Sequence, residues 1–151
     1  MGFITKADKK RAFKTVVLDA YLSSQASGYV ENTVNKCVSF LLTVDDVNKY
    51  INQKKYGKLA KYLTSEVNAA IKRQTNFTQQ INFSRFVKKV GGDVESKKMI
   101  TIAVVAEYLM CDLFDKGFNT KLRNQKTITK DMILEGLAHD NDLAKFCKDF
   151  M

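Results

Sequence analysis

The residue types that enzymes use for catalysis are scarce in this chain of 151 residues. His139 is its one histidine, which leaves little room for a metal site or a catalytic triad built on imidazole. Asp45 and Asp46 form an isolated acidic pair without a basic counterpart for acid–base chemistry. No nucleophile with a matching base and no glycine-rich phosphate loop stands out. We therefore expect a protein that is not an enzyme and that holds no cofactor and no metal ion.

The cysteines point to a reducing environment. Cys37, Cys111 and Cys147 are odd in number, widely spaced and not part of a Cys-x-x-Cys pair. This pattern predicts reduced, buried thiols in an intracellular protein.

Met1–Lys10 has no apolar stretch of the length that a secretory leader needs, and Met99–Ala106 is too short to cross a bilayer. We therefore expect no membrane partner.

Basic side chains are the strongest chemical signal in the sequence. Lysine and arginine number 25 against 16 aspartate and glutamate residues, which gives a net charge of +9. A charge of this size predicts a polyanionic partner, with nucleic acid favoured over an anionic membrane. On charge alone, a solvated lysine-rich surface explains the composition equally well. The arginines, which suit the minor groove of DNA better than lysine does, are Arg11, Arg73, Arg85 and Arg123.

The elements that carry these residues are predicted to be helices. The chain has no proline and seven glycines, which favours long helices over a turn-rich β fold. Apolar residues at helical spacing predict a helix over Lys9–Leu22 and a long one over Tyr29–Lys54, capped by Ser27 and about 40 Å in length. Gly57 ends this region, and Thr64-Ser65-Glu66 has the form of a start for a short third helix.

The same pattern then begins again after a polar linker, residues 75–81. A short helix is followed by a long one over about Ser96–Arg123. The next helix starts at Ile128-Thr129-Lys130-Asp131-Met132, which has the same form as Leu63-Thr64-Ser65-Glu66-Val67, and a last helix starts near Asp140. A long helix with a short helix at each end cannot bury its own apolar stripe, so it needs a partner of the same shape. We therefore predict an all-α fold in which two short–long–short units pair within one chain.

The ordered motifs of the second half resemble the 2A-type core histone. Ala103–Leu109 and Cys111–Asp115 are similar to the middle of its long helix, and Lys126–Ile133 is similar to its second loop and third helix. His139–Lys145 resembles the acidic turn that follows, and Ile81–Phe86 resembles the first helix. The resemblance places Arg85, within that first helix, at the position of a minor-groove arginine.

The first half is in register with the 2B-type core histone. Leu63–Arg73 is similar to its third helix, and Lys9-Lys10-Arg11 suits the start of its first helix. A 2B-type half fused to a 2A-type half is the arrangement of the histone doublets of large DNA viruses. The 2B-type terminal helix is expected to be missing or reduced, because Gln74 leads into the linker. The resemblance implies an N-terminal arm (1–8), a 2B-type histone fold (9–74), a linker (75–81) and a 2A-type histone fold with a terminal helix (82–151).

The resemblance implies a protein that packages DNA in a nucleosome-like particle without sequence preference. Its implied partners are double-stranded DNA and a partner pair of 3/4-type histones or their doublet, in the nucleus, a viral factory or a virion. The alternative is a histone-fold interaction module of a transcription or chromatin complex that does not wrap DNA. In a histone-fold pair, helix starts and loops converge on one convex edge, and the residues there are expected to contact DNA. These residues are Lys9, Lys10, Arg11, Lys14, Lys54, Lys55, Lys58, Lys61, Arg85, Lys88, Lys89, Lys97, Lys98, Lys126 and Thr127.

A group of acidic residues is less expected on a DNA-binding protein. By resemblance they form the histone acidic patch, a docking site for arginine-bearing peptides. Asp140 and Asp142 have a second explanation, because acidic residues in the first turn stabilise their own helix. His139 is expected at the surface or at a helix cap, and the aromatic residues are expected in the core. The residues of the predicted patch are Glu107, Asp112, Asp115, Asp140 and Asp142.

Overall fold

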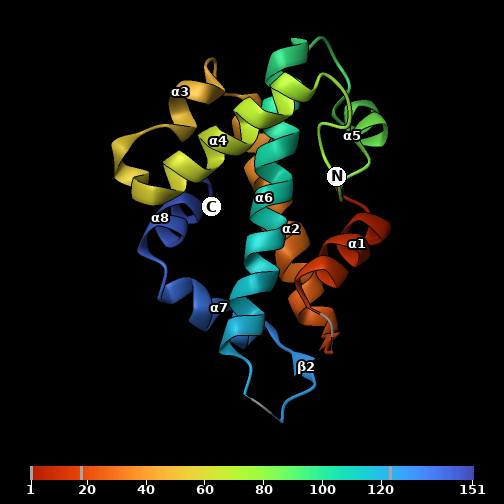
Figure 1. The fold of residues 1–151 in the computed structure, drawn as a ribbon, viewed down its shortest axis with the longest axis vertical. Coiled ribbons are helices and arrows are strands. Elements are labelled where there is room, and N and C mark those ends of the chain that lie inside the picture. The colour runs from red at the N-terminus through yellow and green to blue at the C-terminus, as the bar shows by residue number, and fades with distance from the viewer. Residues whose placement is uncertain (1, 18, 123) are drawn as a thin grey trace.

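The computed structural model describes residues 2–17, 19–122 and 124–151. Within this part the chain forms eight α-helices, one short 3-10 helix and two strands of two residues each, so the expected all-α class is confirmed (Figure 1). In chain order the elements are α1 (Lys6–Val16), β1 (Tyr21–Leu22), α2 (Ser24–Leu42), α3 (Val47–Ile51), η1 (Lys54–Tyr56), α4 (Gly57–Arg73), α5 (Phe83–Val90), α6 (Ser96–Thr120), β2 (Thr127–Ile128), α7 (Lys130–Ala138) and α8 (Asn141–Phe150).

The longest helix, α6, organises the molecule. It runs through the centre of Figure 1 and packs against α1, α2, α4 and α7. Its residues Ile102, Val105, Leu109 and Leu113 are buried, and they belong to the same core as the buried stripe of α2. Burying a side chain of this size stabilises the fold by about 1.5–3 kcal/mol, so the two stripes hold the halves of the chain together. Among the aromatic residues predicted for the core, Phe86, Phe114 and Phe146 are buried, whereas Phe83 and Tyr108 are half-buried.

The first helix lies earlier in the chain than predicted. It begins at Lys6 because Thr5 is its N-cap, and the side chains of Thr5 and Asp8 form a reciprocal capping box. It ends at Val16, and residues 21–22, predicted to be helical, form β1 instead. Phe3 and Ile4, in the segment predicted as an arm, are buried in the core.

The predicted long helix of the first half is broken into two. Ser23, rather than Ser27, caps α2, which ends at Leu42. The side chain of Asp46 then accepts a hydrogen bond from the backbone N–H of Lys49 and starts α3. An uninterrupted helix does not leave this N–H available, because it would bond to the preceding turn. The prediction of one helix over Tyr29–Lys54 is therefore wrong.

The predicted helix start at Thr64 is also wrong, because Thr64 lies inside α4. Gly57 begins this helix rather than ending the region, with a left-handed φ of 53° that glycine adopts without strain. Buried residues of α4 follow one another at helical spacing through the Thr-Ser-Glu sequence, so the helix continues across it. They are Leu59, Ala60, Leu63, Val67 and Ala70.

The second half follows its predicted pattern. The helix α5 begins after its N-cap Asn82, and Gly91 stands at its C-terminal end. The helix α6 ends at Thr120, before the predicted Arg123, which lies outside the described residues. The N-caps Thr129 of α7 and Asp140 of α8 are confirmed, each accepting a backbone hydrogen bond through its side chain.

The halves are tied together at both ends of the central helix pair. The strand β1, between α1 and α2, pairs in parallel with β2, between α6 and α7. Its register places Tyr21 opposite Thr127 and Leu22 opposite Ile128. At the other end, the Lys98 Nζ donates a hydrogen bond to the carbonyl oxygen of Leu42 at 3.2 Å. The strand before α2 is therefore fastened just after the end of α6, and the start of α6 is fastened to the end of α2.

Candidate nucleic-acid interface

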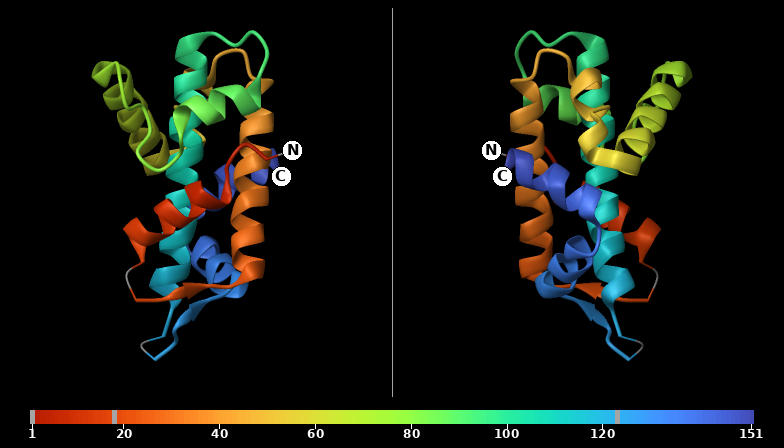
Figure 2. Two further views of the ribbon diagram at one scale, coloured as in Figure 1. Left: turned by 90° about the vertical axis from the view of Figure 1, so that its right-hand side faces the viewer. Right: turned by 90° about the vertical axis from the view of Figure 1, so that its left-hand side faces the viewer.

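The helices α1 and α5 lie on the same side of the molecule, at the right of Figure 1 and facing the viewer in the left-hand panel of Figure 2. Exposed lysines of α1 stand four residues apart, at Lys6, Lys10 and Lys14. On α5 the exposed residues Arg85, Lys88 and Lys89 have the spacing of one helix face. Each helix therefore carries a stripe of positive charge. We call the side formed by these two helices the α1–α5 edge.

Basic residues continue toward the loops at both ends of the long axis. Lys97 is exposed at the start of α6, and Lys126 and Thr127 are exposed beside β1 at the opposite end. The backbone of Lys126 takes part in the strand pairing, since its carbonyl oxygen accepts a 2.7 Å hydrogen bond from the N–H of Tyr21. The side chain of Lys126 is left in solvent, and Tyr21 is 73% exposed next to it. Lys6 and Tyr21 are absent from the predicted site residues, because the first helix is expected to start and end later.

Three of the predicted contact residues hold the fold instead of facing solvent freely. Lys9 lies 2.9 Å from the carboxylate of Glu31, and its side chain is only 12% exposed. Arg11 pairs with the carboxylate of Asp8 and donates to the carbonyl oxygen of Gln80 at 2.9 Å. Lys98 is engaged at Leu42, as described above. Surface ion pairs of this kind stabilise little on their own, but they direct these side chains along the protein surface.

Four predicted contact residues lie elsewhere. Lys54 and Lys55 are on η1, and Lys58 and Lys61 are in the first turns of α4, at the side of Figure 1 away from α1 and α5. The prediction that all basic segments share one edge is therefore wrong for this segment. The physical reason is the early end of α2, because residues 54–61 follow α3 and do not form the loop at the end of a long helix.

The starts of α1 and α5 meet at a buried carboxylate. Asp8 is 1% exposed. It accepts hydrogen bonds from the backbone N–H groups of Thr5 at 2.9 Å and Asn82 at 3.1 Å, and it pairs with Arg11. A buried carboxylate requires such partners, because an unpaired charge in the interior is costly. Asp8 therefore joins the first turn of α1 to the N-cap of α5.

Glu107, one of the acidic residues predicted for the patch, is held by backbone groups. Its carboxylate accepts three hydrogen bonds from the backbone N–H groups of Gln79, Gln80 and Ile81, at distances from 2.9 to 3.0 Å. These residues form the linker between the halves. Glu107 therefore fastens the linker to the middle of α6, and the three donors occupy its oxygen atoms.

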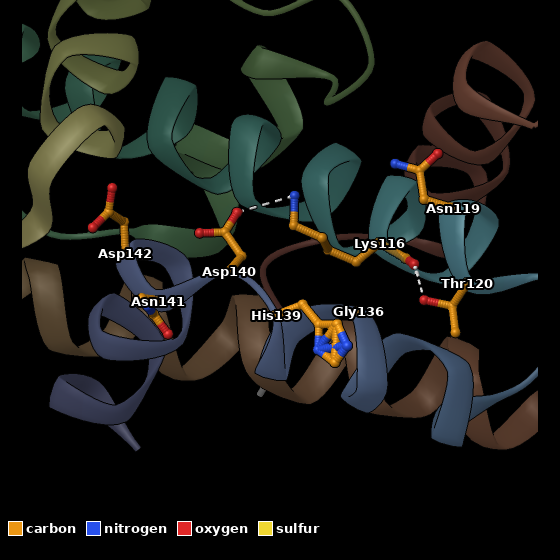
Figure 3. Close-up of a pocket in the computed structure, with 8 residues that line it drawn as sticks. All are labelled: Lys116, Asn119, Thr120, Gly136, His139, Asp140, Asn141 and Asp142. Carbon is orange, nitrogen blue, oxygen red and sulfur yellow. Dashed lines mark hydrogen bonds and ion pairs between the residues drawn. The ribbon is translucent and has the colours of Figure 1, made fainter.

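Asp112 and Asp140 come together around one lysine. The Lys116 Nζ lies 3.0 Å from Asp112. It also lies 3.1 Å from Asp140, a contact that Figure 3 shows. Burial raises the pKa of the Asp112 carboxyl, and the Lys116 ammonium offsets this only in part. Desolvation lowers the pKa of Lys116, but its contacts with the two carboxylates outweigh this and raise it. Lys116 therefore already supplies the positive charge that pairs with these two carboxylates.

The remaining residues of the acidic group have separate local partners. Asp115 accepts a hydrogen bond from the Asn119 side chain at 3.2 Å. Asp142 accepts one from the backbone N–H of Lys58 at 3.0 Å, and its carboxylate lies against the Cα of Gly57. His139 is exposed at the C-cap of α7, as predicted.

An acidic residue on α4 is absent from the predicted patch. Glu66 lines a pocket together with Tyr108 and Cys111 of α6. Burial raises the pKa of Tyr108, and the charges of Asp112 and Glu66 contribute to the shift. No short-range signal in the sequence indicates this neighbourhood, since the local pattern around Glu66 resembles the start of a short helix.

The cysteines do not form a reactive site. Cys37 and Cys147 are buried and Cys111 is half-buried, and all three are free thiols. Burial raises the pKa of Cys111 and of Cys147 to about 12, so both thiols are protonated near neutral pH. The predicted burial is confirmed for Cys37 and Cys147.

Metal ligands do not cluster in the described part of the chain. It contains no group of three or more histidine, cysteine, aspartate and glutamate residues placed to hold a metal ion. None of the helices in this part combines the length and the apolar character that a membrane span requires.

No protein-family model matches this chain, and no curated protein matches its sequence.

Proposed function

We propose that this chain is a tandem histone-fold protein that packages duplex DNA. The α1–α5 edge would bind the DNA backbone without sequence preference. The observation that carries the proposal is the junction at Asp8 and Asn82, where the starts of α1 and α5 meet between two basic stripes. A continuous cationic edge with loops at both ends suits a long, uniform polyanion.

The loop pairing supports the histone-fold part of the proposal. In a histone-fold pair, the first loop of one half lies beside the second loop of the other. The strand β1 would belong to the first loop of the 2B-type half, and β2 to the second loop of the 2A-type half. On this assignment α2 and α6 are the two long helices, and α3 and α7 follow them.

The assignment gives α4 a different role from the one predicted. With α3 as the third helix of the 2B-type half, α4 takes the place of the 2B-type terminal helix that was expected to be missing. The same assignment explains why Glu66 of α4 lies near Tyr108 of α6. The acidic group would then include a residue from each half.

The side chains of the α1–α5 edge have the chemistry that DNA packaging requires. Lysine contacts phosphate groups and carries no sequence information by itself. Arg85, exposed on α5, is suited to a narrow minor groove, where the negative potential is strongest. The Asp8 carboxylate occupies the converging starts of α1 and α5, so the exposed side chains of the two stripes would supply the phosphate contacts.

The proposal includes partners beyond DNA. A pair of 3/4-type histones or their doublet would complete a nucleosome-like particle in the nucleus, a viral factory or a virion. An arginine-bearing peptide would dock at the acidic group. It would bind weakly, because Lys116 already pairs with Asp112 and Asp140.

The test is a titration of unrelated duplexes with the chain. If about six phosphates are neutralised, affinity should fall roughly a thousandfold between 50 and 200 mM salt, equally for each sequence. Strong preference for one short site, or affinity that is independent of salt, would contradict the packaging function. A chain that captures a histone-fold partner but binds no duplex would be an interaction module instead.

A further inference from the structure

One exposed side of α4 is basic and carries no carboxylate, since Glu66, the acidic residue of this helix, lies outside it. The buried residues of α4 occupy one side of the helix, as described above. At 100° per residue, the residues opposite them fall within a sector of roughly 80°. All five of these residues are exposed. We call this set the α4 face: Lys58, Lys61, Ser65, Asn68 and Lys72.

A shallow groove follows the α4 face. It is lined by Asn52 from the end of α3 and by residues of α4 from Lys61 to Lys72. Thr64 and Ser65 add hydroxyl groups between the two lysines. None of the residues that line the groove is acidic. Lysine, serine, threonine and asparagine are side chains that contact phosphate oxygens, so the lining matches a phosphodiester backbone.

Two acidic residues near the start of α4, Asp149 and Asp142, are occupied. Lys55 pairs with Asp149 at 3.1 Å, and the hydroxyl of Tyr56 donates a 2.6 Å hydrogen bond to the same carboxylate. These contacts lower the pKa of Asp149, with the Tyr56 hydrogen bond as the largest cause. Asp142 is held at the start of α4 by the N–H of Lys58. The positive charge of the α4 face and of the exposed Lys54 is therefore left to solvent.

The α4 face is separate from the α1–α5 edge. The 3-10 helix η1 and the start of α4 lie at the left of Figure 1, whereas α1 and α5 lie at the right. The two panels of Figure 2 view these opposite sides. From its start α4 crosses in front of α6 (Figure 1), so a duplex that lies along α1 and α5 leaves η1 and the first turns of α4 open.

We propose that the α4 face, with Lys54, is a second binding surface for duplex DNA, so that one molecule joins two DNA segments. The inference rests on the proposed function, because the first segment occupies the α1–α5 edge. The face favours DNA over an acidic peptide because the groove is lined by polar and basic residues and by Ala69, so it has no apolar pocket for a peptide side chain. Lys61 and Lys72 stand about 16 Å apart along the helix, a spacing that suits an extended polyanion.

The experiment measures bridging between two duplexes. One duplex is tethered to beads, a second is fluorescent and free, and the full chain is added at increasing concentration. The wild-type chain should retain the fluorescent duplex on the beads. The variant Lys58→Glu/Lys61→Glu/Lys72→Glu should lose bridging by about tenfold or more, yet bind a single trace duplex within a factor of about three of wild type.

The matched control carries the same change of charge on the other side. Arg85→Glu/Lys88→Glu/Lys89→Glu should weaken binding to the single trace duplex, and bridging should fall with it. The glutamine versions of both variants repeat the comparison with less risk to folding, and thermal melting checks that each variant is folded. Light scattering records whether the chain is a monomer under these conditions.

The outcomes separate the two proposals. Bridging that survives in the α4 variant overturns the second surface. Self-association of chains whose α1–α5 edge is intact then explains how two duplexes are joined. A wild-type chain that binds one duplex and never bridges two also overturns the second DNA surface. The same holds if the α4 face captures an acidic polypeptide instead of DNA. A wild-type chain that binds no duplex at all contradicts the proposed function itself.

Discussion

The carboxylate of Asp8 accepts a hydrogen bond from the backbone N–H of Asn82 at 3.1 Å, across 74 residues of the chain. This contact joins α1 to α5 at the centre of the basic edge. Because Asp8 is buried, its hydrogen bonds contribute to stability as well as to geometry. The position of the α5 stripe therefore depends on a residue in the first helix.

The variant Asp8→Ala should destabilise the chain by about 2–3 kcal/mol. It removes the capping box of α1 and leaves the N–H groups of Thr5 and Asn82 without their acceptor. Urea unfolding followed by circular dichroism measures the change. Asp19→Ala, at an exposed position, is the control and should change stability by less than about 0.5 kcal/mol. Equal midpoints for the two variants would contradict the role of Asp8.

Glu107 should control the linker between the halves. Glu107→Ala removes the acceptor of three backbone N–H groups, so the linker should open more often. Trypsin should then cut after Arg73, which ends α4 just before the linker, several times faster than in the wild-type chain. Glu135→Ala, exposed on α7, is the control. If cleavage is unchanged and binding of an arginine-bearing peptide is lost instead, Glu107 belongs to the acidic patch.

Two glycines should respond to alanine in opposite directions. Gly57→Ala forces a left-handed φ on alanine and places its Cβ 2.6 Å from the Asp142 carboxylate, so it should cost more than about 1 kcal/mol. Gly28 lies inside α2, where an alanine Cβ would meet no atom within 4 Å. Gly28→Ala should therefore stabilise the chain by about 0.5–1 kcal/mol. Thermal melting of both variants measures the change in stability. Melting temperatures that shift in the same direction for the two variants would contradict this account of Gly57.

Thiol reagents should react slowly with the folded chain. The pKa values of Cys111 and Cys147 are raised to about 12, so the reactive thiolate is rare at pH 8 and its fraction grows only as the pH rises toward 12. Cys111, which is half-buried, should react before the buried Cys37 and Cys147. All three should react at once after denaturation. Rapid labelling of two thiols in the folded chain would contradict their burial.

The parts of the fold that depend on local signals are predictable from sequence. Thr129 and Asp140 cap helices through contacts with residues three positions along, and both starts are predicted correctly. The role of Gly57 depends on Asp142, which lies in the last helix, and no local pattern carries that information. The break after Leu42 escapes prediction because the apolar spacing continues through residues 44–51 even though the backbone turns.

The candidate site is predictable to a similar extent. The stripe of α5 is found because Arg85, Lys88 and Lys89 belong to one correctly predicted helix. Lys54 and Lys58 are predicted on the wrong side because their position follows from the break in the preceding helix. The partners of Glu107 are backbone groups of the linker, which residue types do not disclose.

The central claim is that the α1–α5 edge binds the DNA backbone, and the salt dependence of affinity tests it most directly. The measurement compares the wild-type chain with Arg85→Ala/Lys88→Ala/Lys89→Ala on one trace duplex, as the slope of log K against log salt concentration. If these three residues contact phosphates, the slope should fall by about 2.7. The control Lys36→Ala/Lys145→Ala/Lys148→Ala removes the same charge from exposed positions on α2 and α8 and should change the slope by less than about 1. An unchanged slope in the α5 variant, or an equal fall in both variants, would contradict the account.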